Sequence, residues 1–336
     1  MIPANPNPAY DALIEQISTT YESGRKQAVR QVQTKLLHTY WAIGQYIVEF
    51  EQDGHTKAIY GKKLIPTLAQ DLSLRLGKGF GRVNLTQMRQ LYLRYSNVNA
   101  LSPNLSYSHY VELSNISDDL ERSFYEQQSI RENWGLHELR RQKSSSLFLR
   151  LAASRDKEGV LALSKKGQSI TNPDDLLRDP YVFEFLKIPE HHKYTEGELE
   201  SRLMDNLQNF LLELGKGFTF VGRQYRITIN NKHHRVDLVF YHRILRCFVL
   251  IDLKIKTVKH GDIGQMNMYM GYFASEENVE GDNPPIGIIL SRDKDDLLVE
   301  YATYGMSSQL FVATYQTYLP DRDELQRQLQ AIINED

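Results

Sequence analysis

The chain of 336 residues contains one cysteine, Cys247, and therefore cannot form an internal disulfide. Disulfide-dependent proteins belong to oxidising compartments, so this composition favours a reducing cytoplasm. The longest uninterrupted apolar run, CFVLI, is far shorter than the ~20 residues that span a bilayer. The N-terminal segment, MIPANPNPAY, has no basic stretch followed by an apolar one. We therefore expect neither a signal peptide nor a membrane-spanning segment.

Two further features limit the classes of function that the chain can have. The glycine-rich segment LGKGFG lacks the Gly-Lys-Ser/Thr spacing of a phosphate-binding loop after a strand, so a P-loop enzyme is not expected. The formal net charge is −2, which by itself does not indicate a nucleic-acid-binding protein. Local potential matters more than net charge for attracting phosphates, however. Three basic residues, Arg223, Arg226 and Lys256, fall near the carboxylates described below and are candidate nucleic-acid contacts.

Helical periodicity fills the first half of the chain, and strand-like runs begin near residue 218. Helices are expected over 8–52, 62–76, 84–95, 106–115, 118–132, 135–152 and 196–214. Strands are expected over 218–229, 235–241, 247–254, 286–290 and 310–315, with helices over 261–274, 294–304 and 321–333 between and after them. We expect an α+β protein with an all-helical N-terminal domain (8–153), a connector (154–180) and an α/β domain with a central mixed sheet (181–336).

The segment over 62–95 has the pattern of a helix-turn-helix. One helix ends in GKGFG, where glycines favour a turn, and Asn84 is expected to cap the next helix. Arg82 and Arg89 lie at this second helix, and Arg140 and Arg141 form a basic stripe on a later one. All four are candidate contacts to nucleic acid. The alternative is a helical hairpin that packs only for stability.

Carboxylates interrupt two apolar strands, VDLVFYH and CFVLIDLK. Burying an unpaired charge is costly, so Asp237 and Asp252 at these places need a partner. Side chains alternate along a strand, and Asp252 and Lys254 therefore share one face while Leu253 points to the other. If the strands pair as a hairpin, Asp237 lies beside Asp252. Hard divalent ions take oxygen ligands, and Mg²⁺ or Mn²⁺ between the carboxylates would relieve their repulsion.

Structural explanations compete with this interpretation. Asp237 could pair with an arginine at the strand edge, and Asp252 with Lys254 could form a surface salt bridge that contributes little. Gln265 and Tyr269 share one face of the following helix, where Tyr269 could simply pack in the core. Glu200 lies on the core-facing side of its helix, where a carboxylate is either a ligand or the partner of a buried arginine.

The same residues resemble a known family. The order helix-Glu, strand-Asp, strand-Asp-x-Lys and then Gln-x₃-Tyr is similar to the PD-(D/E)XK nucleases of the restriction-endonuclease-like fold. The segments FLLELGKGFTFVGRQYRI, VDLVFYHRIL and GQMNMYM resemble the YhcG-type family of these nucleases. The N-terminal half resembles it too, at YWAIGQYIVEFEQ, YGKKLI, LGKGFGRVNLTQMRQLY, SYSHYVEL and WGLHELRRQ. The resemblance extends from about residue 10 to 320.

The resemblance implies a role for each matching position. The first acidic motif falls on Glu200, the second on Asp237, and the third on Asp252 and Lys254. Gln265 and Tyr269 match the helix that follows. The family usually has Glu-x-Lys where this chain has Asp252, which keeps the charge but shortens the reach by one methylene.

The expected function is a metal-dependent DNA endonuclease. Asp237, Asp252 and the main-chain carbonyl of Leu253 would hold Mg²⁺ or Mn²⁺, with Glu200 as a further ligand, and Lys254 would orient the attacking water. A homodimer is expected because restriction-like nucleases often pair to cut both strands. The alternative is a nucleic-acid-binding or scaffold protein that cleaves little, including a subunit of a restriction-modification or genome-defence assembly. The sequence leaves the choice between DNA and RNA open.

Overall fold

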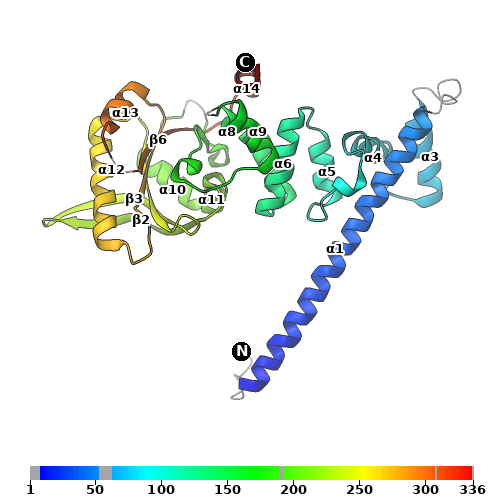
Figure 1. Cartoon of the computed structure of the whole chain (residues 1–336), viewed down its shortest axis with the longest axis horizontal. Coiled ribbons are helices and arrows are strands. Elements are labelled where there is room, and N and C mark those ends of the chain that lie inside the picture. The colour runs from blue at the N-terminus through cyan, green and yellow to red at the C-terminus, as the bar shows by residue number, and fades with distance from the viewer. Residues whose placement is uncertain (1–7, 53–62, 154, 190–191, 307–308, 335–336) are drawn as a thin grey trace. The chain divides into compact units, whose positions relative to one another are not determined.

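A computed structural model describes residues 8–52, 63–153, 155–189, 192–306 and 309–334 of the chain (Figure 1). The chain divides into two compact units, Met1–Arg140 and Arg141–Asp336. Of the helices that the structure describes, none combines the length and the apolar character of a membrane span.

The first unit is all-helical in its described residues, as the sequence predicts. Its helices are α1 (Pro8–Gln52), α3 (Leu64–Leu76), α4 (Arg82–Arg94), η2 (Val98–Ala100), α5 (Tyr107–Ser114) and α6 (Asp119–Glu132). The next helix, α7 (Leu136–Ser144), runs across the boundary between the units in the sequence. A small core joins Ile47 of α1 to Leu85 and Met88 of α4. Gly44 allows this approach, because a Cβ there would lie 2.0 Å from the main-chain oxygen of Met88.

The turn between α3 and α4 is made by glycines, but its cap differs from the expectation. Gly77 and Gly79 have φ values of 82° and 116°, a region that residues with a Cβ seldom adopt. Helix α4 begins at Arg82 with Gly81 in the N-cap position. The prediction of Asn84 as the cap is therefore wrong. Its side-chain amide instead donates to the main-chain oxygen of Gly79 at 3.0 Å, which ties the turn to the first turn of α4.

The second unit contains one six-stranded mixed sheet. Its strands are β1 (Tyr181–Val182), β2 (Phe218–Ile229), β3 (Lys232–His242), β4 (Cys247–Lys254), β5 (Ile286–Ser291) and β6 (Gln309–Gln316). Their order is β1-β6-β5-β4-β3-β2, with β2, β3 and β4 antiparallel and the remaining pairs parallel. The expected α+β class with a central mixed sheet is thus confirmed.

The helices of this unit flank the sheet or precede it. They are α8 (Leu147–Ala152), α9 (Lys157–Lys166), η3 (Pro173–Leu176), η4 (Glu184–Leu186), α10 (Glu196–Asp205), α11 (Leu207–Leu214), α12 (His260–Tyr272), η5 (Phe273–Glu277), α13 (Asp296–Thr303) and α14 (Arg322–Asn334). Two expected helices are divided. Residues 135–152 form α7 and α8 because Ser146 has a φ of 54°, and residues 196–214 form α10 and α11, which meet at Asn206. The stretch expected as an irregular connector contains α9.

The sheet separates two apolar layers, which decides where the carboxylates point. Val249, Ile251 and Leu253 of β4 pack with residues of α10 and α11. Leu250, on the opposite face, packs with residues of α12. Because side chains alternate along a strand, Asp252 and Lys254 follow Leu250 onto the α12 face.

A buried carboxylate fixes the start of the second unit. Glu213 of α11 is fully buried and accepts from Arg150 at 2.8 Å and from Arg141 at 3.1 Å, while Arg178 lies 3.7 Å away. It also accepts from the main-chain N–H of Val182 at 2.9 Å. Burial opposes the charge of Glu213, but the arginines outweigh burial and lower the pKa of this carboxyl. One anion therefore holds three cations from α7, α8 and the segment before β1.

We predict that Glu213→Gln destabilises the protein by about 3–5 kcal/mol, because removing one member of a buried ionic cluster leaves uncompensated charge behind. Thermal and urea unfolding at pH 7 measure the loss. Glu280→Gln, at an exposed position, is the matched control and should unfold like the wild type. Equal stability of the two variants would contradict a stabilising role for the cluster.

Candidate active site at the end of strands β3 and β4

The candidate site begins where β3 and β4 separate. Their last paired residues are Leu238 and Ile251, so continuing the same register would place Asp237 opposite Asp252. That pair is missing from the ladder. The Asp237 carboxylate instead accepts from the main-chain N–H of Leu253 at 2.9 Å. The two aspartates expected to lie together are therefore at neighbouring positions of adjacent strands, at the point where the sheet opens.

Asp252 is buried, with 5% of its surface exposed, and pairs with the Lys254 ammonium at 2.5 Å. Burial and the nearby charge of Asp237 raise the pKa of Asp252 to about 6, although Lys254 works in the other direction. Burial disfavours the ammonium, but Asp252, Asp237 and Glu196 together raise the pKa of Lys254 above its ordinary value. The site thus carries more negative charge than its lysine neutralises.

Glu200 joins the site through a residue that the sequence analysis did not single out. The side-chain amide of Gln224 donates to Glu200 at 2.6 Å and to Asp237 at 3.1 Å. Burial raises the pKa of Glu200, and the charge of Asp237 adds to this effect, although the Gln224 hydrogen bond opposes it. Gln224 therefore bridges a carboxylate from α10 and one from β3.

The backbone of Gln224 is unusual for its residue type. Its φ is 47°, in the left-handed region that few residues other than glycine adopt. The two neighbouring positions, Arg223 and Tyr225, pair with β3 in register, and Gln224 itself does not. A glutamine flanked by strand-forming residues carries no sequence signal for such a conformation. Its place across from Asp237 depends on the register, which becomes known only from the fold.

Gln265 and Tyr269 lie on α12, as expected, and the Gln265 amide donates to the Tyr269 hydroxyl. Tyr269 is buried with 1% exposure, and its ring contacts that of His234. Burial raises the pKa of Tyr269, and the charges of Asp252 and Asp237 add to the effect while the Gln265 bond opposes it. This hydroxyl therefore lies within electrostatic range of both aspartates, while Gln265 is exposed on the same helix.

The residues fit a hard divalent cation by their chemistry. Carboxylates from α10, β3 and β4 and the carbonyl of Leu253 are oxygen donors of the kind that Mg²⁺ and Mn²⁺ prefer. Among the residues with described positions, no three His, Cys, Asp or Glu side chains already form a compact ligand cluster. The amide of Gln224 and the ammonium of Lys254 hold carboxylate oxygens instead. Burial and the charge of Asp237 raise the pKa of Asp252, and a cation bound beside it would offset both effects.

The expected nucleic-acid contacts have different surroundings. Arg82, Arg223 and Lys256 are exposed, and Arg226 is exposed beside the imidazole of His233. Arg89 and Arg140 form ion pairs with Glu51 and Glu112 in the first unit. Arg141 is buried against Glu184 and Glu213. Its guanidinium is therefore unavailable to a phosphate, and the expectation for Arg141 is replaced by a structural role.

Comparisons with known proteins cover both halves of the chain. The model described as the YhcG PDDEXK nuclease domain matches residues 174–330, and the DUF1016 N-terminal domain matches residues 16–150. The Escherichia coli (strain K12) protein named "Putative nuclease YhcG" is 35% identical over 361 residues, which cover 97% of this chain and 96% of that protein.

Two solved structures are also similar in part. A repair endonuclease from Pyrococcus abyssi is 15% identical, with a TM-score of 0.28, over 39% of this chain and 50% of that chain. The structure of EndoMS in apo form is 15% identical, with a TM-score of 0.24, over 39% of this chain and 49% of that chain.

We predict that Asp252→Asn stabilises the protein at pH 7 in the absence of divalent metal, by on the order of 2 kcal/mol. The pKa of Asp252 lies above its ordinary value of 3.8, at about 6, so the wild type loses stability as pH rises between these values. The variant lacks that loss, and the two proteins should converge near pH 3.5. Unfolding in EDTA across this pH range measures the difference.

The exposed change Asp205→Asn controls for charge alone and should show no such pH dependence. Adding Mg²⁺ should raise the unfolding temperature of the wild type more than that of Asp252→Asn, because a bound ligand stabilises only a fold that binds it. If Asp252→Asn is less stable than the wild type at pH 7 in EDTA, the charge on Asp252 does not destabilise the fold as we infer.

We predict that Gln224→Ala lowers stability in EDTA by about 1–3 kcal/mol, because two carboxylates lose their shared donor. Mg²⁺ should restore more stability to this variant than to the wild type, since a cation replaces the missing amide. Gln224→Gly also removes the amide but tolerates the positive φ, so its advantage over Gln224→Ala measures the backbone strain. Identical unfolding of Gln224→Ala and the wild type in EDTA would contradict the bridging role.

Proposed function

Because this chain belongs to the YhcG family of PD-(D/E)XK nucleases, we propose that its second unit hydrolyses phosphodiester bonds of DNA with a bound Mg²⁺ or Mn²⁺. The observation that carries the proposal is the opening of the sheet at Asp237, which places this carboxylate beside Asp252 and Lys254. A merely structural ion pair at a strand end does not require a second carboxylate at the same place.

Each residue of the candidate site has a proposed role in the reaction. Asp237, Asp252 and the carbonyl of Leu253 would hold the metal, with Glu200 as a further carboxylate. A divalent cation in such a site lowers the pKa of a bound water and neutralises charge on the phosphate. Lys254 keeps its proton at pH 7, because its pKa is raised, and its ammonium can donate to the attacking water or to a phosphate oxygen.

Gln265 and Tyr269 contribute by position. Tyr269 is anchored in the apolar layer under α12, and the hydrogen bond between the two side chains fixes the Gln265 amide. That amide is exposed and can donate to a phosphate oxygen of a nucleic acid next to the carboxylates.

Exposed basic side chains of the second unit would supply the part of nucleic-acid binding that does not depend on base sequence. Arg223, Arg226 and Lys256 belong to the β2–β4 part of the second unit and its following loop, and they can contact the phosphate backbone. Arg82 of α4 is a further exposed candidate in the first unit. Arg89 and Arg140 would first have to break their ion pairs with Glu51 and Glu112, so we expect them to contribute less to phosphate binding.

A second candidate function is nucleic-acid binding or scaffolding with little cleavage, as a subunit of a restriction-modification or genome-defence assembly. Asp252 stands where the family usually has glutamate, and it is engaged by Lys254 rather than free for a metal. This alternative predicts salt-dependent binding of nucleic acid without metal-stimulated strand breakage.

We predict that Lys254→Ala slows metal-dependent cleavage by about 100-fold or more, because the reacting phosphate loses a charged donor. The measurement uses purified protein with plasmid, single-stranded and branched DNA, and the matching RNAs, in Mg²⁺ or Mn²⁺. Lys193→Ala, at an exposed position of the same unit, is the matched control. Equal cleavage by Lys254→Ala and the wild type would remove the catalytic assignment.

Binding measured at several salt concentrations separates the two functions. Arg226→Ala should weaken binding to all sequences alike and reduce the salt slope by about one, whether or not cleavage occurs. Binding by the wild type without cleavage in either metal would favour the scaffold function.

A further inference from the structure

The N-terminal half of α1 exposes an apolar stripe that its own unit does not cover. We define this α1 stripe as Tyr10, Ile14, Ile17, Tyr21, Gly24 and Ala28. Successive members are separated alternately by four and three residues, the spacing of the seam in a two-helix coiled coil. Tyr10, Ile14, Ile17 and Tyr21 are 48%, 47%, 60% and 71% exposed. In Figure 1 this half of α1 extends beyond the other helices of its unit.

The stripe lies on the side of α1 that faces away from its own unit. Gly44 marks the inner side, because it contacts the backbone of α4 at Met88. Tyr46, two residues later, points nearly the opposite way and is 67% exposed. Tyr10 and Ala28 precede Tyr46 by whole numbers of turns, about ten and five, and so share its outward side.

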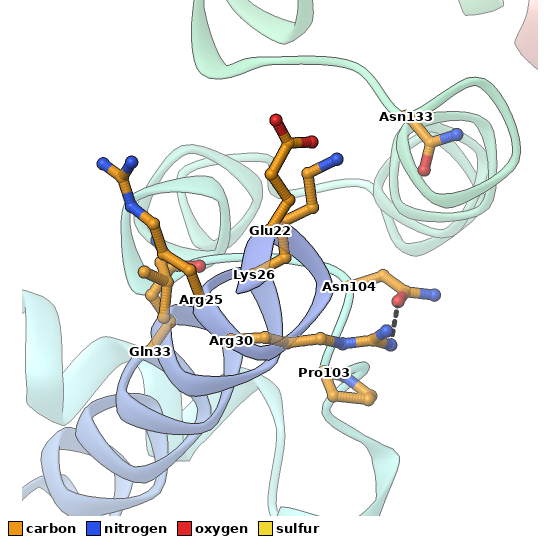
Figure 2. A pocket seen from close by; sticks show the side chains of 9 residues that line it. Glu22, Arg25, Lys26, Arg30, Gln33, Pro103, Asn104 and Asn133 are labelled. Carbon is orange, nitrogen blue, oxygen red and sulfur yellow. Dashed lines mark hydrogen bonds between the residues drawn. The ribbon is translucent and has the colours of Figure 1, made fainter. Parts of the chain in front are cut away.

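The inner side of the same half of α1 is mostly polar, with Val29 as its apolar member, and already has neighbours. Figure 2 shows Lys26, Arg30 and Gln33 lining a hollow beside Pro103 and Asn104, with Arg30 hydrogen-bonded to Asn104. The polar inner side and the apolar outer side are therefore distinct. An outward apolar seam on so long a helix calls for a partner that supplies a matching seam.

Charge is segregated along this half of the helix. Residues 8–22 contain Asp11, Glu15 and Glu22 and no lysine or arginine, whereas residues 25–35 contain Arg25, Lys26, Arg30 and Lys35 and no acidic residue. Lys26 and Arg30 lie on the inner side of the helix, so the charges nearest the stripe are Asp11 and Lys35. Two copies packed antiparallel around residues 21–24 would bring Asp11 of one copy beside Lys35 of the other. Helices pack about 8–10 Å apart, within the range at which salt leaves such attraction effective. Two parallel copies would place like charges together.

Side-chain size favours the same arrangement. With the charge halves matched, the antiparallel seam places Tyr21 of one copy against Gly24 of the other, and Ile17 against Ala28. Tyr21 and Ile17 then each meet a small residue, while Ile14 and Tyr10 meet the aliphatic parts of Gln31 and Lys35. A parallel pair in register would instead set Tyr21 against Tyr21 and Gly24 against Gly24, which crowds one layer and leaves the next unfilled.

We propose that the α1 stripe is the interface of a homodimer in which the two α1 helices pair antiparallel around residues 21–24. The contact is isologous, as in a two-fold symmetric dimer. It lies in the first unit and does not depend on the nuclease chemistry proposed for the second. The Lys254→Ala variant should therefore dimerise like the wild type.

The first test measures the mass of the full chain in solution by light scattering or sedimentation, over roughly a hundred-fold range of concentration. The wild type should have twice the mass of the chain, and Ile17→Asp should weaken association at least tenfold. Leu74→Asp on α3 removes an apolar side chain that is even more exposed than Ile17 but lies outside the stripe, and it should leave the dimer intact. A monomeric wild type, or a dimer that Ile17→Asp leaves unchanged, would overturn the proposal.

A second test reads the direction of pairing and does not depend on how a charged variant folds. Ile17→Cys and Ala28→Cys proteins are prepared separately, mixed and oxidised. The mixture should give a cross-linked dimer that neither protein gives alone, because residue 17 of one copy lies about 16 Å from residue 17 of the other, beyond disulfide reach. The native Cys247 is buried, and wild-type protein treated in the same way controls for it. Cross-linking of Ile17→Cys alone would show a parallel pair and reject the antiparallel dimer.

Discussion

The hydrogen bond from the main-chain N–H of Leu253 to the carboxylate of Asp237 determines the candidate site. In a regular sheet this N–H would donate to a main-chain carbonyl of a neighbouring strand. Here the Asp237 carboxylate accepts from it instead, and the pairing of β3 with β4 ends at Leu238 and Ile251. The substitution places a carboxylate at the open end of an otherwise buried sheet, beside Asp252. Burial raises the pKa of Asp252, and the charge of Asp237 at this opening adds to that effect, while Gln224 donates to the same Asp237 carboxylate.

The second unit contains two clusters of buried charge that are balanced in opposite ways. At Glu213, the three arginines outweigh burial and lower the pKa, so this carboxylate stays charged and holds α7 and α8 to the sheet. At Asp252, burial and the charge of Asp237 raise the pKa despite Lys254, so the protein's own groups do not offset the cost of this charge. An arrangement that costs stability and lies at an open sheet end is typical of a functional site, whereas a compensated one is typical of a structural role. The contrast separates the two clusters more sharply than burial does, because Asp252 and Glu213 are both buried.

Much of the fold and of the candidate site could be predicted from the sequence because these features depend on local patterns. Period-two alternation places Asp252 and Lys254 on one face, and the apolar runs identify β3 and β4 to within three residues. Long-range features were less accessible. Ser146 divides an expected helix through one left-handed residue, and Arg141 reads as a surface cation although Glu213, distant in sequence, buries it. The role of Gln224 could not be predicted, because it arises from the β2–β3 register and a positive φ. The identity of a single glutamine indicates neither feature. The prediction of Asn84 as the N-cap of α4 failed because Gly81 takes the N-cap position without a side chain.

The described contacts also explain how three carboxylates can stay close without a cation. Unpaired, they would repel one another and open the end of the sheet further. The Gln224 amide joins Glu200 to Asp237, the Leu253 N–H holds Asp237, and Lys254 holds Asp252, so each carboxylate has at least one donor from the protein. Of these donors, only the N–H belongs to the main chain, and the amide and the ammonium can turn away without unfolding the sheet. A shorter carboxylate at position 252 suits this arrangement, because it keeps its oxygens near the backbone level at which Leu253 anchors Asp237. The exchange of glutamate for aspartate is therefore compatible with a site that is organised in advance by its own hydrogen bonds.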